Sequence, residues 1–192
     1  LKPSESAPYT SKILINVLSN VFPTEWVSVV EGNAKVAQDL LKIQWDYIFF
    51  TGSTKIGKKV AIAAAKFLTP ITLELGGKSP CIVDGSAPIQ KTARRIVWGK
   101  YLNCGQTCIA PDYILVKSEF KENLIRAIIH EIKKAFGNDA SKSDDYGRII
   151  HKKHFKKLES DINNQNVIYG GKKNVKDLYF EPTIVDSPSM DS

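Results

Sequence analysis

The sequence lacks a long apolar run and contains few sulfur-bearing residues. No stretch approaches the roughly 18 to 20 apolar residues that a membrane-spanning helix needs. No charged-then-apolar leader opens the chain either, which argues against secretion. Its three cysteines are an odd number in 192 residues, which argues against a disulfide framework and for a reducing compartment. We therefore expect a cytoplasmic protein, without a membrane segment in this chain.

Signatures of metal and nucleic-acid binding are also missing. Cys104 and Cys108 are separated by three residues rather than the two of a redox or zinc pair, and no second cysteine pair follows. His151 and His154 share a helix face with several lysines and no evident third ligand. The net charge of +7 raises nucleic acid as a partner, but the lysines are scattered without interleaved aromatic residues. We predict no metal site and no nucleic-acid partner.

The two ends of the sequence suggest a longer protein. The chain opens at Leu1, and its only methionine is Met190. Residues 1–4 read as the close of a strand whose beginning is missing. We therefore expect these residues to be an internal part of a larger chain.

Hydrophobic periodicity predicts alternating helices and strands. Helical spacing marks residues 7–22, 34–43, 54–67, 89–102, 120–136 and 152–163. Short apolar or β-branched runs predict strands at 26–30, 47–50, 71–75, 81–83, 114–116, 167–169 and 179–185. Such alternation with short connections implies an α/β fold whose parallel sheet is covered on both faces, a doubly wound arrangement. We place a domain boundary at Gly76, which gives domains 1–76 and 77–192.

A small glycine-containing loop at 103–111 separates a helical run from a strand-like run and carries Cys108. A thiol is nucleophilic near neutral pH even when little of it is ionised, and a polar loop or a helix terminus raises the thiolate fraction. Cys108 is therefore a candidate nucleophile, with a small buried hydrophobe as the alternative. We interpret Cys104 as an ordinary small residue at the end of the preceding helix.

Glu74 is a candidate general base. It stands in an apolar run before Gly76-Gly77, at the C-terminal end of a predicted strand, which is the edge where α/β sheets bind ligands. Burial there would raise the pKa of its carboxyl group and suit it to accept a proton. The alternatives are an exposed carboxylate or one paired with Lys78.

The turn at 51–54 joins a predicted strand to the N-terminus of a helix. Free backbone N–H groups and the helix dipole favour a phosphate at such a turn. Gly52 would let the backbone approach the ligand, and Ser53 could add a hydroxyl donor. The alternative is that Ser53 is an ordinary helix cap.

Four motifs in order and at approximate spacing resemble the aldehyde dehydrogenase superfamily. They are Lys2-Pro3-Ser4-Glu5, Phe50-Thr51-Gly52-Ser53-Thr54, Leu73-Glu74-Leu75-Gly76-Gly77-Lys78 and Asn103-Cys104-Gly105-Gln106-Thr107-Cys108. Residues 109–113, 146–150 and 181–183 are similar to the class 3 branch, which includes fatty-aldehyde enzymes. The resemblance covers essentially the whole chain. It implies an aldehyde dehydrogenase fold truncated at both ends, with part of a Rossmann-like NAD(P)-binding domain in 1–76 and part of a catalytic domain in 77–192.

The resemblance implies roles for individual residues. Cys108 would be the nucleophile and Glu74 the general base in the NAD(P)-dependent oxidation of an aldehyde to a carboxylic acid, through a thiohemiacetal and a thioester. Because Lys2 could reach a ribose hydroxyl or a 2′-phosphate, the choice between NAD and NADP stays open. Contacts with the cofactor are implied for Lys2 and Glu5 at the adenosine ribose, Gly52 and Ser53 near the pyrophosphate, and Leu75 and Gly76.

The resemblance also implies a small-molecule aldehyde substrate and a homodimeric full-length protein. The family's oxyanion-hole asparagine and its nicotinamide-ribose glutamate would lie outside this sequence, so we expect these residues alone to be inactive. Two alternatives stay open. One is a catalytically silent nucleotide-binding fragment of such an enzyme, and the other is a cysteine hydrolase that uses one of the three histidines as its base.

Overall fold

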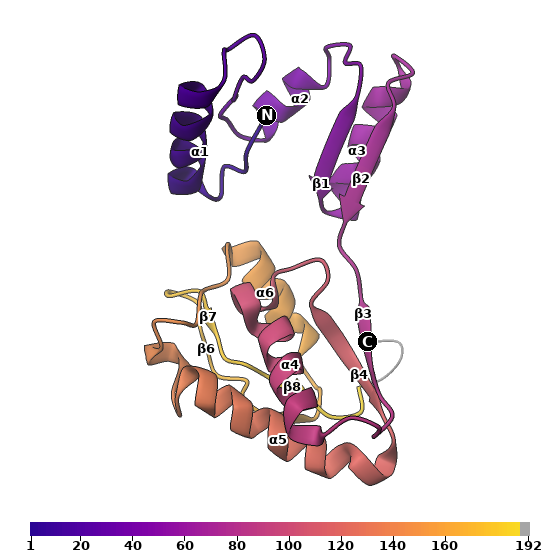
Figure 1. Cartoon of the computed structure of the whole chain (residues 1–192), viewed down its shortest axis with the longest axis vertical. Coiled ribbons are helices and arrows are strands. Elements are labelled where there is room, and N and C mark those ends of the chain that lie inside the picture. Colours follow the sequence, from indigo (N-terminus) through magenta and orange to yellow (C-terminus); the bar gives the residue numbers. More distant parts are fainter. Residues whose placement is uncertain (189–192) are drawn as a thin grey trace. The chain divides into compact units, whose positions relative to one another are not determined.

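The computed structural model divides the chain into two compact units, Leu1–Gly76 and Gly77–Ser192 (Figure 1). The structure describes residues 1–188. Each unit contains a parallel strand pair and helices, which is the α/β class that the periodicity predicts. The assignment of the first unit to the cofactor and of the second to catalysis stays a prediction.

The first unit is built around the parallel pair of strands β1 and β2. The pairing places Thr51 opposite Glu74 and Gly52 opposite Leu75. Helix α3 forms the crossover that a parallel pair requires, and it packs so closely that a Cβ atom at Gly57 would lie 2.8 Å from Leu75 Cδ2. The elements are α1 (Pro8–Val21), α2 (Ala34–Leu40), β1 (Ile48–Gly52), α3 (Thr54–Ala65) and β2 (Ile71–Leu75).

The prediction of a strand at 26–30 is wrong. Within this run, Val30 N–H donates to the carbonyl oxygen of Leu1 at 2.9 Å, and the ammonium group of Leu1 donates to Ser28 O at 2.6 Å. Trp26 N–H and Val27 N–H both donate to Pro23 O in a local turn, so only part of the run pairs with another segment. A strand needs a ladder of such pairs, so the segment stays irregular.

The expectation of a sheet covered on both faces is also wrong for the first unit. Leu75 faces α3, whereas Phe49 on the opposite face of the pair is 67% exposed. The helix prediction for α1 is confirmed, but its apolar side is open as well, with Ile13 64% and Val21 63% exposed. The periodicity thus identified apolar faces that no described residue covers.

The second unit combines a parallel pair with two small antiparallel pairs. Strands β3 and β4 run parallel, β5 pairs with β8, and β6 pairs with β7. Of these strands, only β6 has no counterpart in the sequence prediction. The elements are β3 (Ser79–Val83), α4 (Ile89–Tyr101), the 3₁₀ turn η1 (Leu102–Gly105), β4 (Pro111–Val116), α5 (Ser118–Phe136), the 3₁₀ turn η2 (Ala140–Lys142), α6 (Lys152–Asp161), β5 (Val167–Tyr169), β6 (Lys173–Asn174), β7 (Tyr179–Phe180) and β8 (Ile184–Val185).

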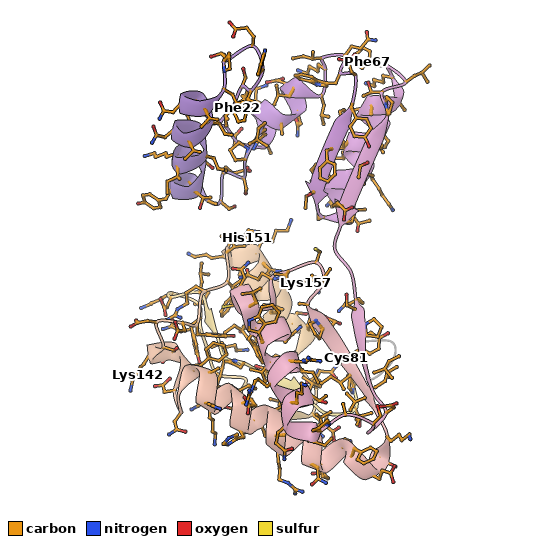
Figure 2. The ribbon with its side chains drawn as sticks, in the orientation of Figure 1. Phe22, Phe67, Cys81, Lys142, His151 and Lys157 are labelled. Atoms are coloured by element: carbon orange, nitrogen blue, oxygen red, sulfur yellow. The ribbon has the colours of Figure 1, made fainter. Side chains whose placement is uncertain are left out.

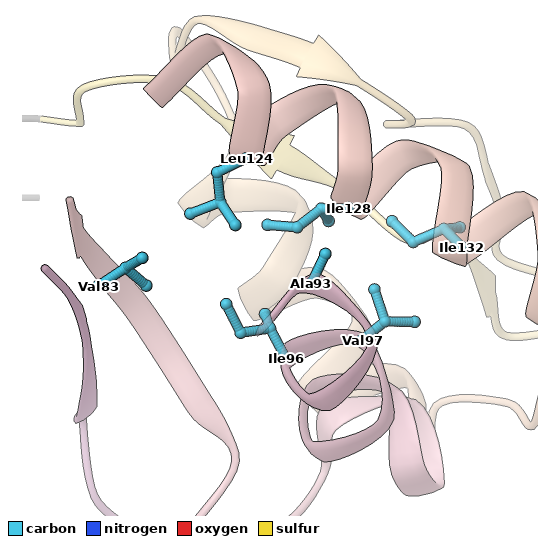
Figure 3. Close-up of a cluster of buried hydrophobic side chains, with 7 residues drawn as sticks. All are labelled: Val83, Ala93, Ile96, Val97, Leu124, Ile128 and Ile132. Atoms are coloured by element: carbon cyan, nitrogen blue, oxygen red, sulfur yellow. The ribbon is translucent and has the colours of Figure 1, made fainter. Parts of the chain in front are cut away.

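The main core of the second unit lies between α4, α5 and the parallel pair (Figure 3). Ala93 is fully buried where the two helices cross, and Cys81 of β3, labelled in Figure 2, packs against the cluster. Burial raises the pKa of the Cys81 thiol, so this cysteine is a small hydrophobe. Six residues of the core come from the two helices that helical spacing predicted at 89–102 and 120–136. The cluster comprises Val83, Ala93, Ile96, Val97, Leu124, Ile128 and Ile132.

Candidate active site

Cys108 lies in the turn that connects η1 to β4, and its side chain is exposed. The turn closes where Ala110 N–H donates to Thr107 O at 3.3 Å, and Ala110 itself is 6% exposed. The next residue begins β4, so the chain becomes fixed in the sheet directly after the turn. The thiol is therefore presented outward from an anchored segment and is not the buried hydrophobe of the alternative interpretation.

The backbone before this turn is strongly bent. Asn103, Cys104 and Gly105 all have positive φ angles, at 51°, 56° and 76°. Only glycine adopts this region freely, so two of the three residues are held there by their surroundings. A Cβ atom at Gly105 would lie 2.9 Å from the carbonyl oxygen of Lys100, which explains glycine at this position.

The side-chain amide of Gln106 joins the cysteine loop to the segment 148–150. Its Nε2 donates to Arg148 O at 3.0 Å and to Asn103 O at 3.1 Å. Its Oε1 accepts from the backbone N–H of Ile150 at 2.9 Å. One side chain thus fixes the loop internally and attaches it to a distant part of the unit.

Cys104 lies beneath the loop. Its Sγ is 3.3 Å from the position that a Cβ atom would take at Gly147, and the residue packs against two clusters that include Tyr146 and Phe180. Burial raises the pKa of the Cys104 thiol, and a hydrogen bond with the Tyr146 side chain opposes this only in part. Cys104 is a packing residue, although it lies in the bent η1 turn and not in helix α4.

The segment after Gly76 also touches the cysteine loop. A Cβ atom at Gly77 would lie 3.4 Å from the carbonyl oxygen of Cys108, so the two backbones pass close together. Next to it, Lys78 Nζ lies 3.1 Å from a carboxylate oxygen of Asp112 on β4. Lys78 therefore has a partner other than the Glu74 that the sequence offered as an alternative.

Glu74 lies on β2 in the first unit and is exposed. It belongs to the face of the strand pair opposite α3, whereas Leu75 points toward α3 and is half-buried. Of the interpretations that the sequence left open, the described chain therefore matches the exposed carboxylate and not the buried carboxyl group. Gly76 follows at the strand end, and a Cβ atom there would meet no atom within 4 Å.

Ser53 caps helix α3, as the alternative interpretation of the 51–54 turn expected. Its side-chain oxygen accepts from Ile56 N–H at 3.4 Å, and its backbone carbonyl accepts from Gly57 N–H at 2.8 Å. Gly52 is the last residue of β1 and precedes the cap directly. The predicted order of strand, glycine and helix N-terminus is therefore present.

Lys2 and Glu5 lie beside a small cavity in the first unit. Lys2 Nζ is 3.3 Å from Glu5 Oε2 and donates to Pro3 O at 2.8 Å. A hydrogen bond from the backbone of Glu5 and one from the Lys2 side chain hold the pKa of the Glu5 carboxyl below its ordinary value. The cavity has a volume of about 250 Å³ and is lined by Pro3, Ser4, Glu5, Pro8, Ser11, Glu31 and Gly32.

None of the three histidines hydrogen-bonds Cys108 in the part of the chain that the structure describes. His151 stands at the start of α6, before Lys157 (Figure 2), and its Nδ1 accepts the backbone N–H of His154 at 3.0 Å. Within residues 1–188, no group of three or more potential ligands is arranged to hold a metal ion. The geometry therefore gives no support to a cysteine–histidine hydrolase.

The chain matches a known protein family over its whole length. The family model described as the aldehyde dehydrogenase family matches residues 1–192. The chain belongs to the aldehyde dehydrogenase family. The sequence motifs had indicated this superfamily, and the match confirms it.

Relatives of this aldehyde dehydrogenase chain include class 3 enzymes. It is 41% identical over its whole length to 4,4′-diaponeurosporen-aldehyde dehydrogenase of Staphylococcus aureus and covers 42% of that protein. Over 96% of its length it is 44% identical to mouse aldehyde dehydrogenase family 3 member A2, covering 38% of it. It is also 43% identical to the rat dimeric NADP-preferring aldehyde dehydrogenase, over 96% of this chain and 41% of the rat protein. The chain thus spans about two fifths of the length of these relatives.

Solved aldehyde dehydrogenase structures share the fold. The substrate-bound state of Staphylococcus aureus AldH matches all of this chain and 42% of its own, with a TM-score of 0.91 and 41% identity. A betaine aldehyde dehydrogenase from the same organism, in complex with NAD⁺, matches 99% of this chain and 41% of its own, with a TM-score of 0.86 and 30% identity. The fold is therefore a partial aldehyde dehydrogenase fold. No helix within residues 1–188 has the length and apolar character needed to cross a membrane.

The sequence did not predict that Gln106 and Arg148 help to hold the cysteine loop of this aldehyde dehydrogenase chain in place. Both stand in segments that carry the resemblance, so the motifs mark the right regions. Neither spacing nor composition shows that two loops 42 residues apart are hydrogen-bonded. A polar residue two positions before a candidate nucleophile was the one available signal.

Proposed function

We propose that the protein containing this chain oxidises an aldehyde to a carboxylic acid, with Cys108 as the nucleophile and Glu74 as the general base. The observation that carries the proposal is the exposed thiol of Cys108 on an anchored turn, in a chain whose whole length matches the aldehyde dehydrogenase family. An exposed thiol in a polar loop can reach a small-molecule carbonyl, whereas Cys81 and Cys104 are held in packed surroundings.

The chemistry follows from what these residues can do. The Cys108 thiolate adds to the aldehyde carbon and gives a thiohemiacetal oxyanion, which the backbone N–H of Cys108 is suited to stabilise. A bound nicotinamide cofactor supplies the hydride acceptor. Loss of hydride from the carbon leaves a thioester on Cys108. Glu74 then takes a proton from water, hydroxide attacks the thioester, and the acid leaves with regeneration of the thiolate.

The cavity beside Lys2 and Glu5 supports the assignment of these residues to the nucleotide. It is lined by the Glu5 carboxylate, which can accept from ribose hydroxyls, and by the hydroxyl-bearing residues Ser4 and Ser11. The Lys2 ammonium group lies beside it and can donate to a hydroxyl or to a phosphate. We assign Gly52 and Ser53 to the pyrophosphate. Leu75 and Gly76, at the end of β2, are assigned to a further contact with the cofactor. The names of the relatives, one NADP-preferring and one in complex with NAD⁺, support either nucleotide.

Replacement of the thiol tests the proposal in the natural full-length protein. Cys108→Ser should abolish formation of carboxylic acid from an aldehyde and NAD(P), because a serine hydroxyl is a far weaker nucleophile at neutral pH. Cys81→Ala removes a core thiol of the same unit and should keep the activity. Full turnover by Cys108→Ser would remove the assigned nucleophile.

A second candidate function rests on the cavity, because its lining comes from the first unit alone. The 192-residue chain by itself would then bind a nucleotide without turning over aldehyde. Calorimetric titration with NAD and NADP, paired with an assay of acid formation, separates the two. Normal turnover by residues 1–192 would contradict the inactivity that we expect from so partial a chain. The cytoplasmic location and the homodimer of the full-length protein stay predictions, the latter supported by the name of the rat relative.

A further inference from the structure

The side-chain amide of Gln106 makes three hydrogen bonds, all of them with backbone groups. Both N–H directions are occupied, by the carbonyl oxygens of Asn103 and Arg148, and the amide oxygen accepts from Ile150 N–H. A side-chain amide that both donates to and accepts from one extended segment mimics a strand partner. Gln106 therefore connects two segments of backbone, and the connection is lost when its amide is removed.

The segment that Gln106 holds is itself fixed by the Arg148 side chain. The guanidinium group donates to Ser141 O and Tyr146 O, both at 2.9 Å, and to Asp177 Oδ2 at 2.8 Å. Its central carbon lies 5.2 Å from the centre of the Tyr179 ring. A planar guanidinium group with hydrogen-bond partners on several sides has one favoured orientation. The 148–150 segment is therefore a rigid support for the cysteine loop.

Cys108 has no hydrogen bond of its own to fix it within the described residues, and its side chain is exposed. Its position therefore depends on its neighbours in the chain. On the C-terminal side they enter β4, and on the N-terminal side the first side-chain anchor is Gln106, two residues away. Directly before that anchor, within η1, the backbone of residues 103–105 is held at positive φ, a conformation that would relax if the anchor were lost.

We propose that Gln106 is a positioning residue for the nucleophile, which fixes the Cys108 turn by attaching it to the Arg148-supported segment. The proposal rests on the function proposed above, in which Cys108 attacks the substrate. Its effect on the reaction is indirect, because Gln106 itself touches no substrate. Misplacement of a reacting group by about 1 Å costs on the order of a hundredfold in rate, so a loosened turn has a measurable effect.

Gln106→Met tests this in the natural full-length protein, because methionine has similar length without hydrogen bonds. We expect kcat to fall about ten- to a hundredfold, with the KM for the aldehyde little changed. The rate at which iodoacetamide alkylates Cys108, followed by peptide mass analysis over a range of pH, should change in magnitude or midpoint. Gln90→Met, on the exposed surface of α4, is the matched control and should change neither quantity.

Arg148→Lys provides a second variant, because it keeps the charge but loses the fork. It should shift kcat and the alkylation profile in the same direction as Gln106→Met. If Gln106→Met fails to fold, Arg148→Lys tests the positioning role in its place. The inference fails if Gln106→Met has the same kcat and alkylation profile as Gln90→Met while Cys108→Ser is inactive. If Gln106→Met does not fold, the same comparison is made with Arg148→Lys. Should Cys108→Ser keep full activity, the proposed function and the positioning role that rests on it both fail.

Discussion

The ammonium group of Lys2 lies 3.3 Å from the carboxylate of Glu5, so two of the predicted cofactor-binding residues form an ion pair with each other. Lys2 is the more buried partner, with 17% of its side chain exposed against 51% for Glu5. A glutamate is already ionised at neutral pH, and the lowered pKa of Glu5 keeps the pair ionised toward more acidic pH. The cavity edge therefore presents a donor and an acceptor whose charges offset each other.

Glu5→Gln should change the nucleotide preference. Loss of the carboxylate leaves the Lys2 charge without its partner, which favours the additional phosphate of NADP. The ratio of the dissociation constant for NAD to that for NADP should rise about twofold to fivefold, the range of an exposed ion pair. Calorimetric titration measures both constants. Asp39→Asn breaks the exposed ion pair of Asp39 on α2 with Lys42, at 2.6 Å, and should leave the ratio unchanged. A fall of the ratio after Glu5→Gln would contradict the assignment.

Glu74→Gln should separate the two halves of the reaction. Thiol addition and hydride loss do not need the carboxylate, whereas hydrolysis of the thioester does. The full-length protein should show a burst of reduced cofactor followed by a steady-state rate lower by about a hundredfold or more, with acyl-enzyme detectable by intact mass. Glu25→Gln changes an exposed glutamate of the first unit and should show no burst. An unchanged steady-state rate after Glu74→Gln would exclude Glu74 as the base.

Gly105→Ala and Gly137→Ala form a matched pair, because both glycines have φ near 77°, at 76° and 78°. A Cβ atom at Gly137 meets no atom within 4 Å, whereas one at Gly105 lies 2.9 Å from Lys100 O. Gly137→Ala should cost about 1–3 kcal/mol in the free energy of unfolding, because at ψ −178° its backbone lies in a region that glycine almost alone adopts. Gly105→Ala should cost more and also lower kcat, because the cysteine loop must move. Denaturant unfolding and steady-state kinetics test this, and equal costs with equal kcat would contradict it.

Alkaline pH should destabilise the second unit. Burial is the largest cause that raises the pKa of Tyr101, Tyr146 and Tyr179, the last to about 12. Unfolded tyrosine has a pKa near 10, so the stabilisation by the protonated phenols is fully present below about pH 10 and is lost as pH rises toward the folded values. Tyrosinate absorbance and circular dichroism, followed against pH, should therefore change together for these side chains.

Two variants check the tyrosine interpretation. Tyr146→Phe should reduce the alkaline loss of stability. At neutral pH it should cost about 1–3 kcal/mol, because Phe180 O loses the donor that now lies at 2.9 Å. Tyr9→Phe, at a side chain that is 81% exposed, should alter neither. Titration of all seven tyrosines near pH 10 without unfolding would refute the prediction.

Periodicity predicted the helices well because a buried helix repeats its apolar residues along one face. Helices α4 and α5 are the clear example, since the residues at helical spacing form the core of the second unit. The same reasoning could not determine what covers a face, as the exposed apolar side of α1 shows. It also failed for residues 26–30, because β propensity does not reveal whether a partner strand is present.

The sequence named candidate site residues, whose roles stay predictions, but it did not predict their geometry. The motifs located Cys108, and the loop and its following strand appear where expected. The sequence left open whether Glu74 is buried, and it is exposed because one apolar neighbour on each side does not bury a residue at the open face of a two-stranded pair. The hydrogen bonds of Gln106 were beyond prediction, since contacts between loops depend on the packed tertiary structure.

The long sequence separation of the Gln106 hydrogen bonds has a consequence for folding order. The contact with Ile150 spans 44 residues, and Arg148 in turn depends on Asp177, another 29 residues along the chain. Closing such loops costs more entropy than forming α4 or α5, so these bonds form late. During synthesis, when N-terminal parts fold first, the cysteine loop emerges well before the residues that hold it. We therefore expect the candidate nucleophile Cys108 to be synthesised early and to reach its final position among the last events of folding.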